Sequence, residues 1–272
     1  DGKFILSSSS SLSQFDPTTG RFSIICQKEG LYPQVFCDLL ERKPLVWMND
    51  SGYSIVKGNE LIPIKFQFLD NQLPSPTFVP LKLLDLGQHH YLIQGLEGII
   101  DFHFQPKDSI YQATWNSFDQ QCLAIDCDHD HNVYLLMGTK VYTYDGNGKI
   151  TEYMDTKVAN NNAIFIDSKK SIWISNAGRK EIFRIMERKF EKIRLITRNG
   201  RRTDVIYPFT INFFEDNQKN IWICTDGNGV FKYQPNQIQF SKADIGFIRC
   251  INSMNNEIWV GTFNNGLWRL NR

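Results

Sequence analysis

The strongest constraint in this sequence is an aromatic residue that returns at nearly constant spacing along the whole chain. In five of the seven repeats an acidic residue stands six positions before it, with a polar turn between the two. The aromatic positions are Phe4, Trp47, Tyr91, Tyr134, Trp173, Trp222 and Trp259. They lie 37 to 49 residues apart, about 42 on average, which is the length of four short strands with their turns. The spacing therefore predicts seven repeats of one small antiparallel sheet.

The residues inside each repeat are typical of strands. Short runs rich in β-branched and aromatic residues alternate with Asp, Asn, Gly and Pro, and no stretch has a long helical period. In the sixth repeat the strands are expected at residues 209–215, 220–225, 230–233 and 237–241. The acid is expected to accept backbone N–H groups of the first turn, and the aromatic to fill space between neighbouring sheets. Gly98, Gly229 and Gly266, each seven residues after its aromatic, are expected in turns that require positive φ.

These observations predict an all-β fold, a seven-bladed β-propeller that occupies residues 1–272 as a single domain. The first and last blades are expected to be incomplete, because the first repeat lacks its opening strand and the seventh ends after the strand at 266–270. Unpaired strand edges attract further strands. We therefore expect the chain to be a segment of a longer protein that supplies the missing strands.

Composition argues against several classes of function. The 30 Lys and Arg balance 29 Asp and Glu, so the molecule has no strong overall field to attract nucleic acid or an acidic membrane. No apolar run approaches the roughly 18 to 20 residues that cross a bilayer. Six cysteines without a C-x-x-C pair are expected as small core residues: Cys26, Cys37, Cys122, Cys127, Cys224 and Cys250. Phosphate-loop, nucleophile-elbow and zinc-protease motifs are absent, so we expect neither a catalytic site nor a cofactor.

A candidate binding face follows from propeller geometry. The turns between second and third strands share one face with the connections between blades, and so surround one mouth of the propeller. The candidate ligand-binding residues there are Trp115, Asn161, Asn176, Arg179, Arg201, Arg202, Tyr207, Asp226, Asn228, Phe263 and Asn264. Aromatic faces with amide and guanidinium donors suit sugar rings and their hydroxyls. The alternative for each of these residues is an ordinary polar turn.

Two further segments admit a functional and a structural interpretation. Between Arg184 and Arg202 there are eight basic and two acidic residues, which fits either an anionic saccharide or partner, or the solvated outer strand of the fifth repeat. The alternating carboxylates of residues 126–132 resemble a calcium loop. The pattern is incomplete, because His131 occupies the position that needs glycine and Met137 the one that needs glutamate. We expect a structural turn and no metal.

Three segments of the chain, residues 167–175, 216–226 and 257–267, resemble the two-component regulator propeller repeat. That repeat has the form D-x-x-G-x-hydrophobic-W-hydrophobic-G-T, followed by G-G-hydrophobic. Repeats five to seven match it well and repeats one to four mainly by spacing, while Lys170 and Lys219 stand at or beside the turn glycine. The resemblance implies a periplasmic sensor region of an inner-membrane hybrid histidine kinase of Bacteroidetes-like bacteria, which detects glycan breakdown products. It also implies an oligosaccharide ligand, a second propeller or further domains in the same chain, and a homodimer of the full-length protein, with no membrane contact from this segment.

Two other functions remain open from the sequence. One is a pure assembly and dimerisation scaffold. The other is an enzyme similar to the streptogramin-lyase propellers, whose chemistry needs a histidine base and a metal near the channel mouth. The five histidines are His89, His90, His103, His129 and His131. All fall in repeats three and four, and four of them are expected in turns on the opposite face, which argues against this enzyme.

Overall fold

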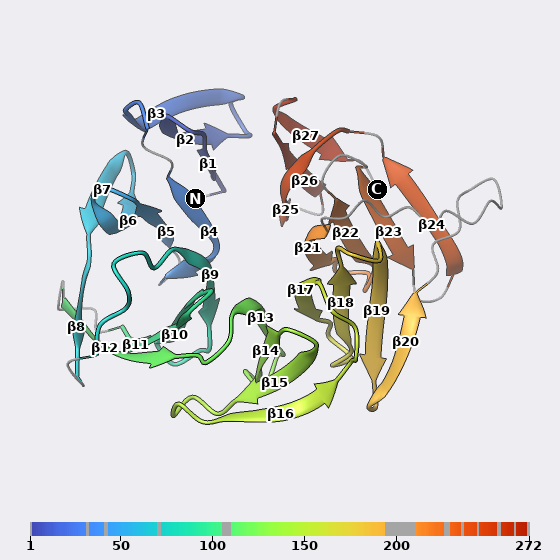
Figure 1. The fold of residues 1–272 in the computed structure, drawn as a ribbon. Helices are drawn as coiled ribbons and strands as arrows, with labels where there is room; N and C mark the ends of the chain where they lie inside the picture. Colours follow the sequence, from blue (N-terminus) through green and yellow to red (C-terminus); the bar gives the residue numbers. More distant parts are fainter. Residues whose placement is uncertain are drawn as a thin grey trace. The chain divides into compact units, whose positions relative to one another are not determined.

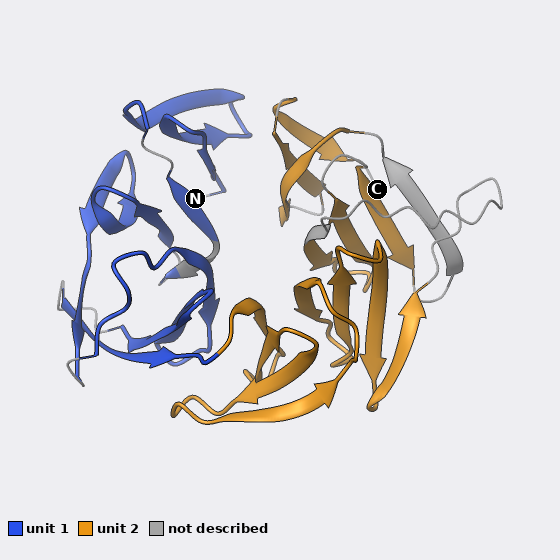
Figure 2. Ribbon diagram, in the orientation of Figure 1, with its two compact units in different colours: residues 1–119 blue, residues 120–272 orange. Residues whose placement is uncertain are grey.

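Every regular element in the described part of the chain is a β-strand, and the strands form seven sheets (Figure 1). The computed structural model describes residues 2–30, 33–40, 43–69, 72–104, 110–193, 210–225, 229–234, 237–243, 245–254, 257–263 and 265–270. The sheets divide between two compact units, residues 1–119 and 120–272 (Figure 2). That the chain is one domain stays a prediction.

The first unit contains sheets 1 to 3. Sheet 1 consists of β1 (Phe4–Ser7), β2 (Ser11–Asp16) and β3 (Arg21–Gln27). Sheet 2 consists of β4 (Gln34–Leu40), β5 (Lys43–Met48), β6 (Gly52–Lys57) and β7 (Glu60–Pro63). Sheet 3 consists of β9 (Pro80–Asp85), β10 (His90–Gly95), β11 (Gly98–His103) and β12 (Ile110–Ser117), joined by β8 (Lys65–Phe68). Each sheet is an antiparallel meander except for β8, which pairs in parallel with β12.

The second unit contains sheets 4 to 7. Sheet 4 consists of β13 (Cys122–Cys127), β14 (Val133–Met137), β15 (Lys140–Tyr144) and β16 (Ile150–Asp155). Sheet 5 consists of β17 (Asn161–Ile166), β18 (Ile172–Asn176), β19 (Glu181–Met186) and β20 (Lys189–Ile193). Sheet 6 consists of β21 (Thr210–Glu215), β22 (Ile221–Thr225), β23 (Val230–Gln234) and β24 (Gln237–Ala243). Sheet 7 consists of β25 (Ile248–Met254), β26 (Glu257–Thr262) and β27 (Leu267–Leu270).

The predicted fold class is confirmed: the seven sheets are the blades of an all-β propeller. Within the second unit the first strands β13, β17, β21 and β25 contact one another in sequence order, as the inner strands of neighbouring blades do. The first and last sheets have three strands each in the part of the chain that is described, as the repeat pattern predicted. We call the end of a sheet where the chain passes on to the next sheet, and where the second and third strands are joined, the crossover end.

The turn acid has a larger role than predicted. The carboxylate of Asp216 accepts backbone N–H groups of Gln218 at 2.9 Å and Asn220 at 3.0 Å, as expected. Its second oxygen also accepts the indole N–H of Trp222 at 2.9 Å. Asp167 makes the same bond to Trp173 at 2.9 Å in sheet 5. The six-residue spacing thus links the first turn to the aromatic of the second strand through a buried hydrogen bond.

Backbone geometry at the turns corrects one prediction and refines another. Gly229 and Gly266 have positive φ, but Gly98 does not. A Cβ on Gly98 would lie 2.4 Å from the carbonyl oxygen of Asn116, so close approach of the neighbouring strand explains this glycine. Lys170 and Lys219 do have positive φ, at 61° and 66°. The turn therefore keeps its left-handed position even where lysine replaces glycine.

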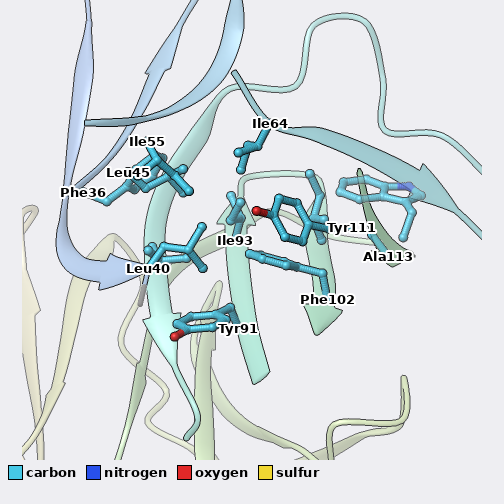
Figure 3. Packing of buried hydrophobic residues seen from close by; sticks show 13 residues of the cluster. Phe36, Leu40, Leu45, Ile55, Ile64, Tyr91, Ile93, Phe102, Tyr111 and Ala113 are labelled. Atoms are coloured by element: carbon cyan, nitrogen blue, oxygen red, sulfur yellow. The ribbon is translucent and has the colours of Figure 1, made fainter. Parts of the chain in front are cut away.

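The core lies between neighbouring sheets. In the first unit, side chains of sheets 2 and 3 interdigitate around Leu45 and Ile93, both fully buried, and around the aromatic pair Tyr91 and Phe102 (Figure 3). In the second unit, separate clusters fill the spaces between sheets 4 and 5, 5 and 6, and 6 and 7. The aromatic of the repeat joins these clusters, as at Trp173 and Trp222. Of the cysteines predicted in the core, Cys122 and Cys224 are buried, whereas Cys26, Cys127 and Cys250 are only partly buried.

One connection in the first unit is unusual. The outer strand of sheet 2, β7, is followed directly by β8, which pairs in parallel with β12, the outer strand of sheet 3. The chain then returns to β9, and on the way Phe78 packs edge-on against Trp115 at 5.1 Å between ring centres. One repeat thereby supplies a strand to the next repeat's sheet.

Candidate functional site

A β-bulge recurs at the crossover end of the first strand. In all four sheets of the second unit, the register between the first and second strands shifts by one residue at this end. The extra residues are Leu123, Asn162, Ile211 and Arg249, and Leu81 has the same position in sheet 3 of the first unit. A bulge leaves one residue outside the regular pairing and changes the direction of the side chains around it. Five sheets thus carry one extra residue at this end.

Sheet 7 places aromatic and cationic side chains together at its crossover end. The backbone N–H of Phe263 donates to the carbonyl oxygen of Phe247 at 2.8 Å, which holds the two residues side by side. The guanidinium carbon of Arg249 lies 4.6 Å from the ring centre of Phe263. The two phenylalanines are 49% and 61% exposed. We call Phe247, Arg249, Phe263 and the neighbouring Asn265 the aromatic patch.

Asn265 joins the patch because of a glycine. Gly246 has a φ of +82°, and a Cβ there would lie 3.0 Å from the amide nitrogen of Asn265. The side chain of Asn265 therefore lies beside the connection that carries Phe247, and Asn265 is exposed. The patch combines two open aromatic rings, one guanidinium and one amide within a single sheet.

Unpaired positive charge lies at the same end of sheet 5. Arg179 and Lys157 are exposed, and neither forms an ion pair with any residue that the structure describes. The nearby carboxylate of Asp155 is already engaged: it accepts the backbone N–H of Lys157 at 2.8 Å and the hydroxyl of Thr139 at 2.9 Å. These two bonds lower the pKa of Asp155. Asp155 therefore keeps its negative charge beside Lys157, and Arg179 is an exposed cation at this end of sheet 5 without a described carboxylate partner.

Two predicted residues serve the fold itself. Asn161 and Asn176 are both 2% exposed, and the Asn176 amide donates to the Asn161 amide oxygen at 2.9 Å. Asn161 also donates to the carbonyl of Val158 at 2.8 Å, and the oxygen of Asn176 accepts the backbone N–H of Arg179 at 2.6 Å. Their polar atoms fix the connection and the turn from which Arg179 projects.

The remaining predicted residues are distributed as follows. Trp115 lies in β12 of the first unit, where it is 9% exposed and packs against Phe78, so its ring belongs to the core. Phe263 is in the aromatic patch. Arg201, Arg202, Tyr207, Asp226, Asn228 and Asn264 lie outside the described residues. Phe247, Arg249 and Asn265 were missed. When the repeats are aligned on their first strands, Arg249 stands at the position of Leu81, Leu123, Asn162 and Ile211, so its charge is distinctive, but only the structure shows that this position is a bulge.

The carboxylate-rich segment 126–132 is a structural turn. One oxygen of Asp128 accepts the backbone N–H groups of Asp130 and Asn132, each at 2.9 Å. Asp126 accepts the backbone N–H of Ile166 at 2.7 Å, which ties sheet 4 to sheet 5. No group of three or more metal-binding side chains occurs among the described residues. These carboxylates are therefore used in holding the turn and the neighbouring sheet.

The described part of the basic run is the outer hairpin of sheet 5, as the structural interpretation predicted. Arg184 pairs with Glu191 and Lys192 with Glu181 across neighbouring strands. Arg188 lies at the opposite end of the sheet, with its guanidinium carbon 5.4 Å from the ring centre of Tyr153. These pairs leave little free charge on the hairpin.

All five histidines lie at the end opposite the crossover end. His89, His129 and His131 are in the turns between first and second strands, and His90 begins β10. His103 ends β11 and stacks on His90 at 4.3 Å between ring centres, while Nε2 of His90 lies 2.6 Å from the carboxylate of Asp101. The aromatic patch therefore has no histidine in its own sheet or at its end of the other described sheets.

Comparison with known proteins identifies the fold. No protein-family model matches this chain, and no curated protein matches it. The extracellular domain of the hybrid two-component system BT3049 from B. thetaiotaomicron superposes with a TM-score of 0.70 at 15% identity, over 98% of this chain and 37% of that one. This chain has the fold of two-component sensor propellers.

Two lyases have the same fold. Virginiamycin B lyase from Staphylococcus aureus superposes with a TM-score of 0.74 at 11% identity, over 97% of this chain and 89% of that chain. A streptogramin B lyase structure gives 0.54 at 15% identity, over 99% and 79%. At such identities a match establishes the fold alone, because one fold supports unrelated functions. This chain also spans little more than a third of the two-component domain. No helix in the described residues is long and apolar enough to cross a membrane.

Proposed function

We propose that this chain is the ligand-sensing propeller of an extracytoplasmic two-component receptor, and that it binds an oligosaccharide at the aromatic patch. The observation that carries the proposal is the pair Phe247 and Phe263, held together by a backbone hydrogen bond while their rings stay largely exposed. Exposed apolar surface beside fixed polar groups is typical of binding sites. The C–H faces of a sugar ring would stack on the phenyl rings. The guanidinium of Arg249 and the amide of Asn265 would bind its hydroxyls.

The fold supports a receptor role. The same fold occurs in an extracellular domain of a hybrid two-component system, of which this chain spans 37%. In such a receptor, further domains and a partner subunit would read out the ligand-bound state. We therefore place the protein in the periplasm, as part of a membrane-anchored dimer that detects glycan fragments and controls the genes for their use. A second propeller of the same chain would complete the ligand site or the dimer surface.

The alternative with specific support is a lyase, because lyases share this fold. The position of the histidines argues against it. A general base must reach the reacting group, and the described histidines lie at the end opposite the candidate binding surface. Incubation with a type B streptogramin and a divalent metal, followed by mass spectrometry, tests this. Metal-dependent opening of the substrate that is lost in His103→Ala would replace the sensor proposal with the lyase.

Thermal stability of the purified chain against a panel of neutral and acidic oligosaccharides tests the sensor proposal. A ligand at 100 times its dissociation constant should stabilise the protein by about 2.7 kcal/mol. Phe263→Ala should abolish this stabilisation. Phe22→Ala is the matched control, since Phe22 is 63% exposed but lies in sheet 1 of the first unit.

Either of two results would contradict the proposal. If no saccharide stabilises the chain, the assembly scaffold becomes the better interpretation. If stabilisation survives Phe263→Ala but is lost in Phe22→Ala, the binding surface is elsewhere.

A further inference from the structure

Arg249 differs from its counterparts in the other sheets of the second unit. The fold repeats the same bulge in sheets 4 to 7, and the bulged residues of sheets 4 and 6 are Leu123 and Ile211. In sheet 5 the residue is Asn162, whose amide oxygen accepts the hydroxyl of Ser175 at 3.0 Å. Only in sheet 7 is the bulged residue of this unit charged. A bulge that elsewhere carries neutral side chains therefore aims a guanidinium at the crossover end.

The position of this guanidinium leaves its hydrogen-bond donors available. Its carbon lies over the ring of Phe263, 4.6 Å from the ring centre. The N–H donors of a guanidinium lie in its own plane and point away from a ring stacked on its face. Arg249 is exposed and forms no ion pair with the residues for which the structure gives a position. The contact with Phe263 therefore holds a guanidinium whose N–H donors have no acceptor in the described chain.

Other charges in the second unit behave differently. Some cations of the second unit are matched by carboxylates across neighbouring strands: Lys140 pairs with Glu152 at 2.7 Å, and Arg184 pairs with Glu191. At the crossover ends, Arg179 and Lys157 join Arg249 as exposed cations outside any ion pair within the described chain. A neutral sugar needs one or two donors but no excess of positive charge. An anionic sugar would benefit from the charge of Arg249, which lies in the patch itself.

We propose that the saccharide bound at the aromatic patch carries a carboxylate, and that Arg249 recognises it as a uronic acid. This inference rests on the proposed function and names its ligand class. The sugar ring stacks on Phe247 and Phe263, while the two carboxylate oxygens accept the paired N–H donors of Arg249. A guanidinium matches a planar carboxylate with two parallel hydrogen bonds, which a lysine ammonium does not do. Arg249 thus sets specificity, and the phenylalanines supply affinity for the ring.

Binding of uronate oligosaccharides and of their methyl esters to the full chain tests the inference. The panel contains galacturonate, glucuronate and mannuronate oligomers, each with the methyl ester that keeps the sugar and removes the charge. Calorimetry should show binding of at least one uronate, with affinity about 10- to 100-fold lower for its ester. Arg249→Gln should cause a loss of the same size for the uronate and little change for the ester. Arg249→Lys should restore only part of the affinity. Unchanged melting temperatures would confirm that the variants fold.

Arg188→Gln is the matched control, because Arg188 also stacks on an aromatic ring but lies at the opposite end of sheet 5. It should bind like the parent protein. Equal affinity for acid and ester, unaffected by Arg249→Gln, would overturn the carboxylate assignment while leaving the sensor proposal intact. Selective binding of a sulfated, carboxylate-free oligosaccharide would overturn it as well. If no member of the panel and no neutral oligosaccharide binds, the proposed function itself fails and the inference falls with it.

Discussion

Replacing Asp216 by alanine should destabilise the second unit strongly, because its carboxylate organises the first turn of sheet 6. Asp216 is 3% exposed. It accepts the backbone N–H of Gln218, the backbone and amide N–H groups of Asn220 and the indole N–H of Trp222, all between 2.9 and 3.0 Å. Burial raises the pKa of this carboxyl, but the hydrogen bonds from Asn220 and Trp222 outweigh burial and hold the pKa below its ordinary value. The carboxylate is therefore ionised and fully occupied at neutral pH.

The expected loss follows from the donors that remain. In Asp216→Ala the backbone N–H of Asn220 and the indole N–H of Trp222 lose their acceptor while buried, whereas the Asn220 amide keeps a bond to the Gln218 side chain and the backbone N–H of exposed Gln218 can turn to water. A hydrogen bond to a charged group contributes about 1.5 to 3 kcal/mol, so two such losses amount to about 3 to 6 kcal/mol. For a chain of this size, at about 2 to 4 °C per kcal/mol, that corresponds to a fall in melting temperature of roughly 6 to 24 °C. Urea unfolding followed by circular dichroism measures the free energy.

Asp145→Ala is the matched control for Asp216→Ala. Asp145 also accepts two backbone N–H groups, from Asn147 at 2.9 Å and Lys149 at 3.1 Å, but in an exposed turn that water can reach. Its replacement should change stability far less. The double mutant of Asp216→Ala with Trp222→Phe isolates the indole bond, with an expected coupling energy of about 1 to 2 kcal/mol. If Asp216→Ala costs no more than Asp145→Ala, the buried carboxylate does not organise the sheet and the reasoning is refuted.

Three further predictions concern stability. The hydroxyl of Tyr53 is buried and makes no hydrogen bond in the described structure, so Tyr53→Phe should leave urea stability unchanged or raise it by up to about 1 kcal/mol, and a clear loss would contradict this. His131 has a φ of 62°, so His131→Gly should stabilise by about 0.5 to 1 kcal/mol, whereas His129→Gly, without positive φ, should destabilise. The pKa of Asp216 is lower in the folded state, so its contribution to the free energy of unfolding is complete above the unfolded pKa of about 4 and is lost as pH falls through the folded pKa. Melting temperatures measured from pH 7 to 3 should therefore differ between the parent and Asp216→Ala at neutral pH and converge below about pH 4.

The repeat spacing predicted the blades well because a propeller places the same side chains in the same structural role in every repeat. The strands expected in the sixth repeat agree with β21 to β24 to within one or two residues at the ends the structure describes. The acid-to-aromatic spacing predicted the turn at Asp216, but not the indole bond to Trp222. Spacing gives the positions of two residues along the chain, whereas the bond depends on the rotamer that brings the indole back over the turn.

The site was less predictable because burial cannot be read from residue type. Asn161 and Asn176 have the amides of a sugar site, yet these close a buried network within the fold. By residue type alone, Arg249 cannot be distinguished from an ordinary basic residue of a strand. Its special position depends on a bulge, which is a shift in strand pairing that leaves little trace in composition. Phe247 could have been recognised only through its hydrogen bond to Phe263, which joins residues from two separate connections.

The strand β8 couples the unfolding of sheets 2 and 3 in the first unit. In a linear array of repeats, stability is the sum of each repeat and its interface with the next, and an end can fray without disturbing the middle. Here the second repeat contributes a hydrogen-bonded strand to the third sheet, so the edge of sheet 3 cannot open without displacing chain that leads directly from sheet 2. The two blades are therefore expected to open as one cooperative unit, with amide protons on β8 and β12 exchanging together. A ligand or partner that tightens either blade would slow exchange in both.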